Sequence, residues 1–167
     1  MRKSISIEQI DAFIFDFDGV LTNNLVYIDE NSNEAVRCSR SDGLAFDVLR
    51  KIEKPVYILS TEKNPVVSAR AKKMQVPVIQ GVGDKVLTLS RLAKDKSYTM
   101  SKLLYVGNDL NDYYAMKLCG FSACPIDSHK KIKKIATFVL NTEGGSGVVR
   151  EPVEEIIGLD FLKTLYP

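Results

Sequence analysis

Residues 12–19 have the sequence Ala-Phe-Ile-Phe-Asp-Phe-Asp-Gly. The four apolar residues form a short run typical of a buried β-strand, and the glycine marks a turn after it. Asp16 and Asp18 lie two positions apart, so an extended backbone would place both carboxylates on the same face. Two carboxylates that close repel each other unless a cation neutralises them or one takes up a proton. The stretch therefore predicts a buried strand that ends in a reactive acidic pair.

A divalent cation with oxygen ligands suits such a pair, and Mg²⁺ is the usual choice beside phosphate. A carboxylate held by Mg²⁺ can attack phosphorus, while its neighbour protonates a leaving alcohol. The alternative is a pair of turn-forming acids at the end of a strand. The apolar strand before the pair and the Gly-Val-Leu-Thr at residues 19–22 favour the catalytic interpretation.

Short apolar runs alternate with helix-period stretches along the rest of the chain. Further strands are predicted at residues 55–59, 76–79, 103–106, 121–124 and 137–140. Helices are predicted after Asp42, Asn64-Pro65, Asp84 and Asp109, with a last one over residues 152–157. This alternation is typical of βαβ units on a mostly parallel sheet, an α/β fold of the Rossmann-like kind.

Polar residues follow three of the predicted strands. They are Asp16 and Asp18, then Ser60 and Thr61, then Asn108, Asp109 and Asp112. In open α/β sheets, ligands bind beyond the carboxyl ends of the strands. We therefore expect these residues to share one site.

Composition limits the class of protein. The 167 residues contain 23 Lys+Arg against 21 Asp+Glu, which argues against a dedicated nucleic-acid binder. The length suits one domain over residues 1–167, and no apolar run approaches the ~20 residues of a membrane span. Residues 1–5 lead into polar and acidic residues, which predicts no signal peptide and a cytoplasmic location. The three cysteines lack CxxC spacing, which favours reduced thiols.

The motif Asp-Phe-Asp-Gly-Val-Leu-Thr at residues 16–22 resembles the first motif of the haloacid dehalogenase (HAD) superfamily of phosphohydrolases. The resemblance implies that Asp16 is a nucleophile and Mg²⁺ ligand. It implies that Asp18 is a general acid and base whose backbone carbonyl also binds the metal. Ser60 matches the second motif, a hydroxyl for the phosphoryl group, and Lys85 matches the third, a cation beside it. A turn-capping serine and a solvated lysine are the alternatives for these two residues.

The stretch Gly107 to Asp112 matches the acidic fourth motif, with one departure. The family usually has aspartate directly after the glycine as a metal ligand, whereas this chain has Asn108. An amide oxygen can still bind Mg²⁺, with one negative charge fewer. The resemblance implies contacts with the metal or the substrate from Asp109 and Asp112.

The insert at about residues 23–41 is too short for a cap domain and suits a β-hairpin. The chain therefore resembles the capless HAD subfamily that dephosphorylates sugar-acid phosphates, a three-layer sandwich with a hairpin in place of a cap. The tail, about residues 143–167, contains Gly-Gly-Ser-Gly-Val-Val-Arg-Glu, which is similar to a signature of that subfamily. The resemblance implies a homotetramer built on the hairpins, in which the tail closes a neighbour's site and Arg150 contacts the substrate.

Two substrate classes compete within the subfamily. Phosphatases of eight-carbon octulosonate 8-phosphates have Gly-Arg after the second-motif hydroxyl, and this chain has Thr61-Glu62. A glutamate there, with a basic residue a helix-length later, resembles phosphatases of nine-carbon nonulosonate 9-phosphates. Arg70 and Lys73 are the candidate partners of the sugar-acid carboxylate. The alternative is an exposed, charged helix face.

A different class of function competes with the enzyme. Similar domains are fused to sialic-acid cytidylyltransferases, where they serve as oligomerisation modules with little or no catalysis. Asn108 supports this alternative, while Asp16, Asp18 and Lys85 favour the enzyme. The basic run at residues 130–134 lacks aromatic neighbours and predicts a solvated helix, not a nucleic-acid site.

Overall fold

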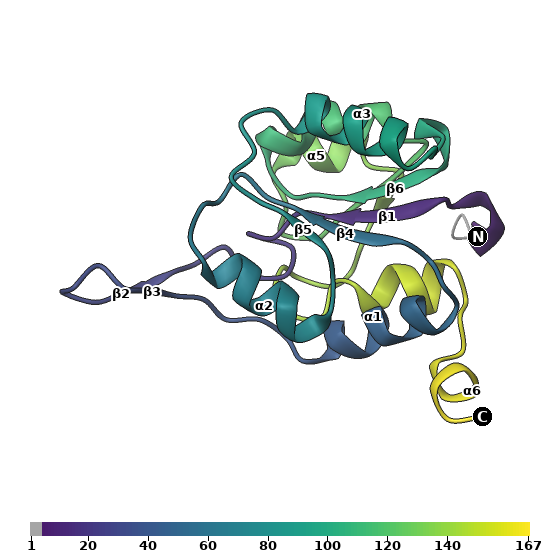
Figure 1. Ribbon diagram of the computed structural model, residues 1–167, viewed down its shortest axis with the longest axis horizontal. Coiled ribbons are helices and arrows are strands. Elements are labelled where there is room, and N and C mark those ends of the chain that lie inside the picture. Colours follow the sequence, from purple (N-terminus) through teal and green to yellow (C-terminus); the bar gives the residue numbers. More distant parts are fainter. Residues whose placement is uncertain (1–4) are drawn as a thin grey trace.

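The computed structural model describes residues 5–167, and a six-stranded sheet lies at its centre (Figure 1). Across the sheet, the strands are β5 (Val78–Ile79), β4 (Val56–Leu59), β1 (Ala12–Phe15), β6 (Leu103–Val106), β7 (Phe121–Cys124) and β8 (Phe138–Val139). Every neighbouring pair in this sheet is parallel. The predicted α/β fold is confirmed. Residues 1–4, which entered the signal-peptide prediction, lie outside the described residues.

Strand β1 is buried on both of its faces, which explains its uninterrupted apolar sequence. Phe13 and Phe15 pack into one core cluster, and Ala12 and Ile14 pack into the other. The chain proceeds from β1 outward to β4 and β5, and then returns past β1 to β6. The order in which the chain adds strands to the sheet therefore reverses at β1, and the acidic pair directly follows this strand.

Helices cover both faces of the sheet (Figure 1). One layer contains α1 (Ser41–Lys51) and α2 (Val66–Met74), and the other contains α3 (Lys85–Asp95), α4 (Tyr113–Leu118) and α5 (Lys130–Ile135). A π-helical turn, η4 (Pro152–Ile156), and α6 (Phe161–Leu165) pack on the side of α1. The three-layer sandwich is thus confirmed. Among residues 5–167, no helix has the length and apolar character needed to cross a bilayer.

The predicted helix starts at Asn64-Pro65 and Asp84 are confirmed, whereas the predicted cap at Asp42 is wrong although a helix forms there. The Asp84 side chain accepts a hydrogen bond from the Leu87 N–H (3.0 Å), as a capping residue does. The Asn64 side chain accepts one from the Val66 N–H (3.0 Å). Asp42, in contrast, lies inside the first turn of α1, fully buried, and its carboxylate accepts a hydrogen bond from the Val149 N–H (2.9 Å). A long-range contact thus takes the place of the predicted cap.

The insert forms an antiparallel hairpin, β2 (Tyr27–Ile28) and β3 (Glu34–Ala35), which projects from the body of the molecule (Figure 1). Alternation along a strand over residues 25–28 predicts that one apolar pair is exposed, either Leu25 with Tyr27 or Val26 with Ile28. The structure instead exposes four consecutive apolar side chains, Leu25, Val26, Tyr27 and Ile28, each by 50–68%. Because the hairpin has no layer above or below it in a single chain, both of its faces meet solvent.

Candidate active site

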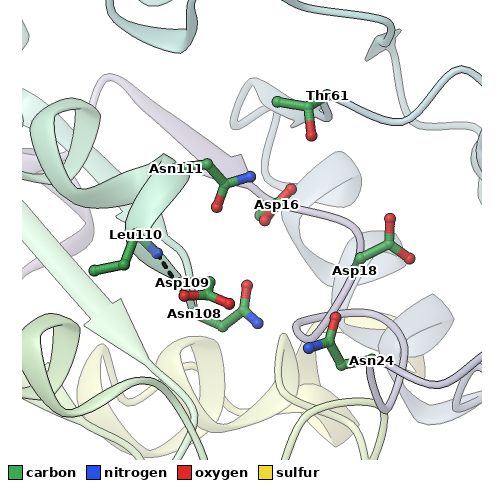
Figure 2. Close-up of a pocket in the computed structure, with 8 residues that line it drawn as sticks. All are labelled: Asp16, Asp18, Asn24, Thr61, Asn108, Asp109, Leu110 and Asn111. Carbon is green, nitrogen blue, oxygen red and sulfur yellow. Dashed lines mark hydrogen bonds between the residues drawn. The ribbon is translucent and has the colours of Figure 1, made fainter.

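A pocket of about 320 Å³ opens beyond the carboxyl ends of β1 and β6 (Figure 2). It is lined by Asp16, Asp18, Asn24, Thr61, Asn108, Asp109, Leu110 and Asn111. These residues follow three different strands, so only the parallel sheet brings them together. The pocket lies where ligands bind in open α/β sheets.

The acidic pair shares the pocket, but not for the predicted reason. Strand β1 ends at Phe15, so both aspartates lie in the turn that follows and not on one pleated face. Asp16 is buried, and its Oδ1 accepts a hydrogen bond from the Phe17 N–H (2.8 Å). Asp18 is half-buried beside it. The turn therefore gives the two carboxylates unlike surroundings.

Lys85 lies beneath the pocket between two buried carboxylates. Its Nζ is 2.9 Å from Asp16 Oδ1 and 2.6 Å from Asp112 Oδ1. The Tyr105 hydroxyl donates a hydrogen bond to the same Asp112 oxygen (2.8 Å). A buried cation at the start of a helix opposes the helix dipole, so these carboxylates are what stabilises Lys85 there.

Burial and neighbouring charges shift the pKa values of these groups. Burial, with a further contribution from Asp112, raises the pKa of Asp16 to about 8, although Lys85 acts in the opposite direction. Burial and Glu62 raise the pKa of Asp18. For Lys85, burial disfavours the charge, but Asp16 and Asp112 outweigh it and raise the pKa. Without a further cation, these shifts favour the protonated forms of Asp16 and Asp18 over two neighbouring carboxylates.

Asn108 supplies an oxygen suited to such a cation. The side chain is 7% exposed, and its Oδ1 is buried without a hydrogen-bond partner among residues 5–167. Figure 2 shows this oxygen directed toward Asp16. Gly19 has a φ of +80°, and a Cβ there would collide with the Asn108 amide, so only glycine leaves room for it. A buried polar atom without a partner is costly unless a ligand satisfies it.

The donor set fits a hard divalent cation. Asp16, Asp18 and Asn108 all line the pocket and offer carboxylate and amide oxygens. Within the described part of the chain, no group of three or more His, Cys, Asp or Glu residues is placed to hold a metal. The amide oxygen and backbone carbonyls would therefore have to complete the coordination.

The structure distributes the other predicted residues over several places. Thr61 and Asp109 line the pocket, and Asp109 also accepts a hydrogen bond from the Leu110 N–H (2.7 Å). Asp112 lies below the pocket, fully buried, and is engaged by Lys85 and Tyr105. Ser60, buried at the end of β4, accepts a hydrogen bond from the Glu62 N–H (3.1 Å).

The predicted binders of the substrate carboxylate lie apart from the pocket in a single chain. Arg70 and Lys73 line a second cleft, about 310 Å³, between α1 and α2, and Arg70 donates a hydrogen bond to the Ser39 carbonyl (2.8 Å). Arg150 pairs with Glu154 (2.6 Å). Glu62 accepts hydrogen bonds within its own loop, including one from the Asn64 N–H (2.8 Å).

Sequence reasoning missed three residues that line the pocket, Asn24, Leu110 and Asn111. Asn24 has a left-handed backbone (φ 63°), which asparagine adopts more readily than most residues. The side chain of Asn24 lies near Asp18 in Figure 2. Asn24 lies outside the four motifs, and its only signal was the asparagine pair at residues 23–24 directly after the first motif. Leu110 and Asn111 lie within the stretch Gly107 to Asp112 but are not among its acidic residues.

The comparisons with known proteins agree with this geometry. The model of the haloacid dehalogenase-like hydrolases matches residues 50–151, and the chain belongs to that family. The resemblance drawn from residues 16–22 is thereby confirmed, and the chain is an enzyme of the hydrolase class.

Several relatives are phosphatases of one kind. The chain is 30% identical to the 3-deoxy-D-manno-octulosonate 8-phosphate phosphatase of Escherichia coli, over 86% of this chain and 77% of that one. A crystal structure of a HAD-family hydrolase from Streptomyces avermitilis superposes with a TM-score of 0.92, at 37% identity over 96% of this chain and 92% of that one. The Moraxella catarrhalis octulosonate 8-phosphate phosphatase, in complex with magnesium, phosphate and the sugar acid, gives 0.84, at 27% identity over 93% and 87%.

Proposed function

We propose that this chain is a Mg²⁺-dependent phosphatase that hydrolyses the phosphate monoester of a 2-keto-3-deoxy sugar acid through an aspartyl-phosphate. The observation that carries the proposal is the arrangement around Asp16. A buried lysine contacts its carboxylate at 2.9 Å, and the unpartnered oxygen of Asn108 faces it within one pocket. The relatives named above support the same class of reaction.

The Asp16 carboxylate, the Asp18 backbone carbonyl and the Asn108 amide oxygen would hold the Mg²⁺. When bound, the ion would offset the charge of the phosphoryl oxygens and of the acidic pair. The residues fit this role because they offer oxygen ligands within one pocket. Asn108 contributes no charge, so we expect weaker metal binding than an aspartate at that position would give.

Asp16 is the nucleophile in this proposal. Lys85 and the Phe17 N–H both contact Oδ1, so we assign the attack on phosphorus to Oδ2. As the bond from Oδ2 to phosphorus forms, the bond from phosphorus to the sugar oxygen breaks. Asp18 gives its proton to that oxygen, and the sugar acid leaves as an alcohol.

Hydrolysis of the aspartyl-phosphate restores the enzyme. Asp18, now a carboxylate, takes a proton from a water molecule whose oxygen attacks phosphorus. The bond from phosphorus to Asp16 Oδ2 breaks, and inorganic phosphate leaves. Lys85 and the Ser60 hydroxyl stabilise the charge that develops on the phosphoryl oxygens in both steps.

A nine-carbon substrate is favoured over an eight-carbon one because Thr61-Glu62 replaces the Gly-Arg expected for octulosonate phosphatases. Glu62 would accept hydrogen bonds from substrate hydroxyls, and Thr61 lines the pocket directly. The sugar-acid carboxylate requires cations, and Arg70, Lys73 and Arg150 lie outside the pocket of a single chain.

In the assembly that the resemblance implies, the tail of a neighbouring copy would bring Arg150 to this pocket. We propose a homotetramer assembled through the exposed apolar residues 25–28 of the hairpin, because four large apolar side chains in contact with water favour association. Light scattering measures the mass directly. Tyr27→Asp is expected to give a smaller assembly, whereas an unchanged mass would contradict the role of the hairpin.

The enzyme assay compares phosphate release from octulosonate 8-phosphate and nonulosonate 9-phosphate, with and without Mg²⁺. Asp16→Asn is the control, since it keeps the size of the side chain and removes the nucleophile. We expect Mg²⁺-dependent release, faster from the nine-carbon substrate, and a loss of at least ~10³-fold in the variant. Full activity of Asp16→Asn would exclude Asp16 as the nucleophile.

The oligomerisation module remains the second candidate function, and the uncharged Asn108 is the observation that favours it. It predicts a stable oligomer without phosphatase activity on either sugar-acid phosphate. Activity of the wild-type chain that disappears in Asp16→Asn would exclude a purely structural role. The same two preparations therefore separate the two functions.

A further inference from the structure

Glu151 is a buried carboxylate outside the pocket, and the proposed reaction gives it no role. It is 6% exposed and directly precedes η4. Its Oε1 accepts hydrogen bonds from the Asn141 N–H (2.9 Å) and side-chain amide (3.1 Å). Its Oε2 accepts from the Thr142 N–H (2.9 Å) and hydroxyl (2.7 Å). Hydrogen bonds to a carboxylate are roughly twice as strong as neutral ones, so Glu151 fixes the beginning of loop 141–145.

This loop contacts the turn that contains Asp18. The Gly145 N–H donates a hydrogen bond to the Val20 carbonyl (3.0 Å). A Cβ at Gly145 would lie 2.5 Å from the Asn23 N, and a Cβ at Gly144 would collide with the Gly19 carbonyl. The two backbones therefore meet without intervening side chains, and a displacement of the loop must displace residues 19–23.

The loop also reaches the opposite side of the site. The Thr142 carbonyl accepts a hydrogen bond from the Ile126 N–H (3.1 Å), and Asp127 accepts one from the Gly144 N–H (3.0 Å). A little further along the same segment, the His129 N–H donates to the Asn108 carbonyl (2.9 Å). One loop thus contacts both the turn after Asp18 and the segment that holds the backbone of Asn108.

We propose that Glu151 is a positioning residue of the active site, which sets the separation of Asp18 and Asn108 through loop 141–145. The inference rests on the proposed function, because that separation matters only if both residues bind Mg²⁺. It goes beyond that function in assigning Glu151, at the end of the glycine-rich stretch, a role within its own chain. Substitution of residues that hold metal ligands in place, without contacting the metal themselves, typically lowers metal affinity by about 10–100-fold.

The test variant is Glu151→Gln, which keeps one acceptor and turns an amide donor toward the donors of Thr142. We expect the Mg²⁺ dissociation constant, measured by calorimetry without substrate, to rise about tenfold, and kcat to fall similarly with little change in KM. Glu143→Gln is the matched control, because it makes the same chemical change at an exposed position of the same loop. The control is expected to bind Mg²⁺ like the wild type.

Gly145→Ala disturbs the same loop from its other end and leaves Glu151 intact. It is expected to weaken Mg²⁺ binding as Glu151→Gln does, and the double variant is expected to bind no more weakly than either one. Thr142→Val removes only the hydroxyl contact and serves where Glu151→Gln fails to fold. We expect it to weaken Mg²⁺ binding by about threefold, the effect of one modest hydrogen bond.

Two failures can be told apart. In the first, the wild type binds Mg²⁺ and releases phosphate, and the variants do so equally well but melt at a lower temperature. This result would overturn only the role of Glu151. A wild type that neither binds Mg²⁺ nor releases phosphate would overturn the proposed function, and this inference with it.

Discussion

The two halves of the pocket differ in how firmly their residues are held. The floor, as we call Asp16, Lys85, Tyr105, Asn108 and Asp112, is at most 7% exposed and is linked by ion pairs and hydrogen bonds. The rim, as we call Asp18, Asn24, Thr61, Asp109 and Asn111, borders the open side. Buried charges require partners, whereas exposed groups exchange freely with water. We therefore expect substitutions in the floor to affect catalysis and stability together. Around the rim, apart from the general acid and base Asp18, we expect them to affect substrate preference with little effect on stability.

Apart from substitution of the nucleophile itself, Lys85→Met should have the largest effect, because it removes the cation shared by two floor carboxylates. We expect kcat/KM to fall by ~10²–10³-fold. The free energy of unfolding should fall by about 3–5 kcal/mol, since Asp16 and Asp112 would remain buried without their cation. Steady-state kinetics and urea unfolding provide the two measurements.

Lys94→Met is the control for this substitution, because Lys94 is an exposed lysine on the same helix. It should leave both quantities within the scatter of the wild type. Equal effects of the two substitutions would mean that the floor is no more constrained than the surface.

Asn108→Asp should strengthen the binding of Mg²⁺ to the floor. A negative charge replaces a neutral amide oxygen in the floor, so we expect Mg²⁺ to bind about tenfold more tightly. The same change at the rim, Asn111→Asp, should alter the affinity by about twofold, because water screens an exposed charge. Calorimetric titration of both variants measures the difference. The distinction between floor and rim fails if Asn111→Asp strengthens Mg²⁺ binding as much as Asn108→Asp.

Glu62→Gly tests specificity at the edge of the rim. We expect the proposed preference for nine-carbon over eight-carbon substrate, as the ratio of kcat/KM values, to fall by about tenfold. Hydrolysis of a small phosphate ester without a sugar acid should stay within about twofold, because the floor is unchanged. If the ratio of kcat/KM values does not change, Glu62 plays no part in substrate selection. A second variant, Glu62→Gln, removes the charge but keeps the length of the side chain, so it separates these two contributions.

The floor was the more predictable half of the site. Asp16, Lys85 and Asn108 follow buried strands or begin a helix, and local patterns indicate such positions. The six strands and their common direction follow from the same alternation of apolar runs and helices. The contact of Asp112 with Lys85 was not predictable, because it joins segments 27 residues apart through side-chain packing.

The rim and the loops could be predicted less well. Asn24 and Asn111 reach the pocket through turn geometry, and no residue pattern specifies that geometry. Arg70 and Lys73 matched a family pattern, yet a single chain places them in the cleft between α1 and α2. Asp42 had the sequence of a helix cap, and a hydrogen bond from Val149, 107 residues away, overrode it. Local rules fail where a distant segment supplies the partner.

Asp42→Asn should have the smallest effect on activity, because this buried carboxylate does not line the pocket. Its Oδ1 accepts the Val149 N–H, whereas its Oδ2 is buried without a hydrogen-bond partner. Burial raises the pKa of Asp42 from 3.8 to about 7. The folded state therefore favours the protonated form of Asp42. The stability that this form contributes is complete below the pKa of Asp42 in the unfolded chain, and it is lost as the pH rises through about 7.

Asparagine resembles the protonated form and does not titrate. The stability of Asp42→Asn relative to the wild type should therefore increase between about pH 4 and pH 8, by up to ~4 kcal/mol. Urea unfolding of both proteins across this range measures the difference, and groups common to both cancel. If the unfolding free energies of the two proteins change with pH in parallel, Asp42 is as well solvated as a residue of the rim. Burial alone would then not explain the difference between floor and rim.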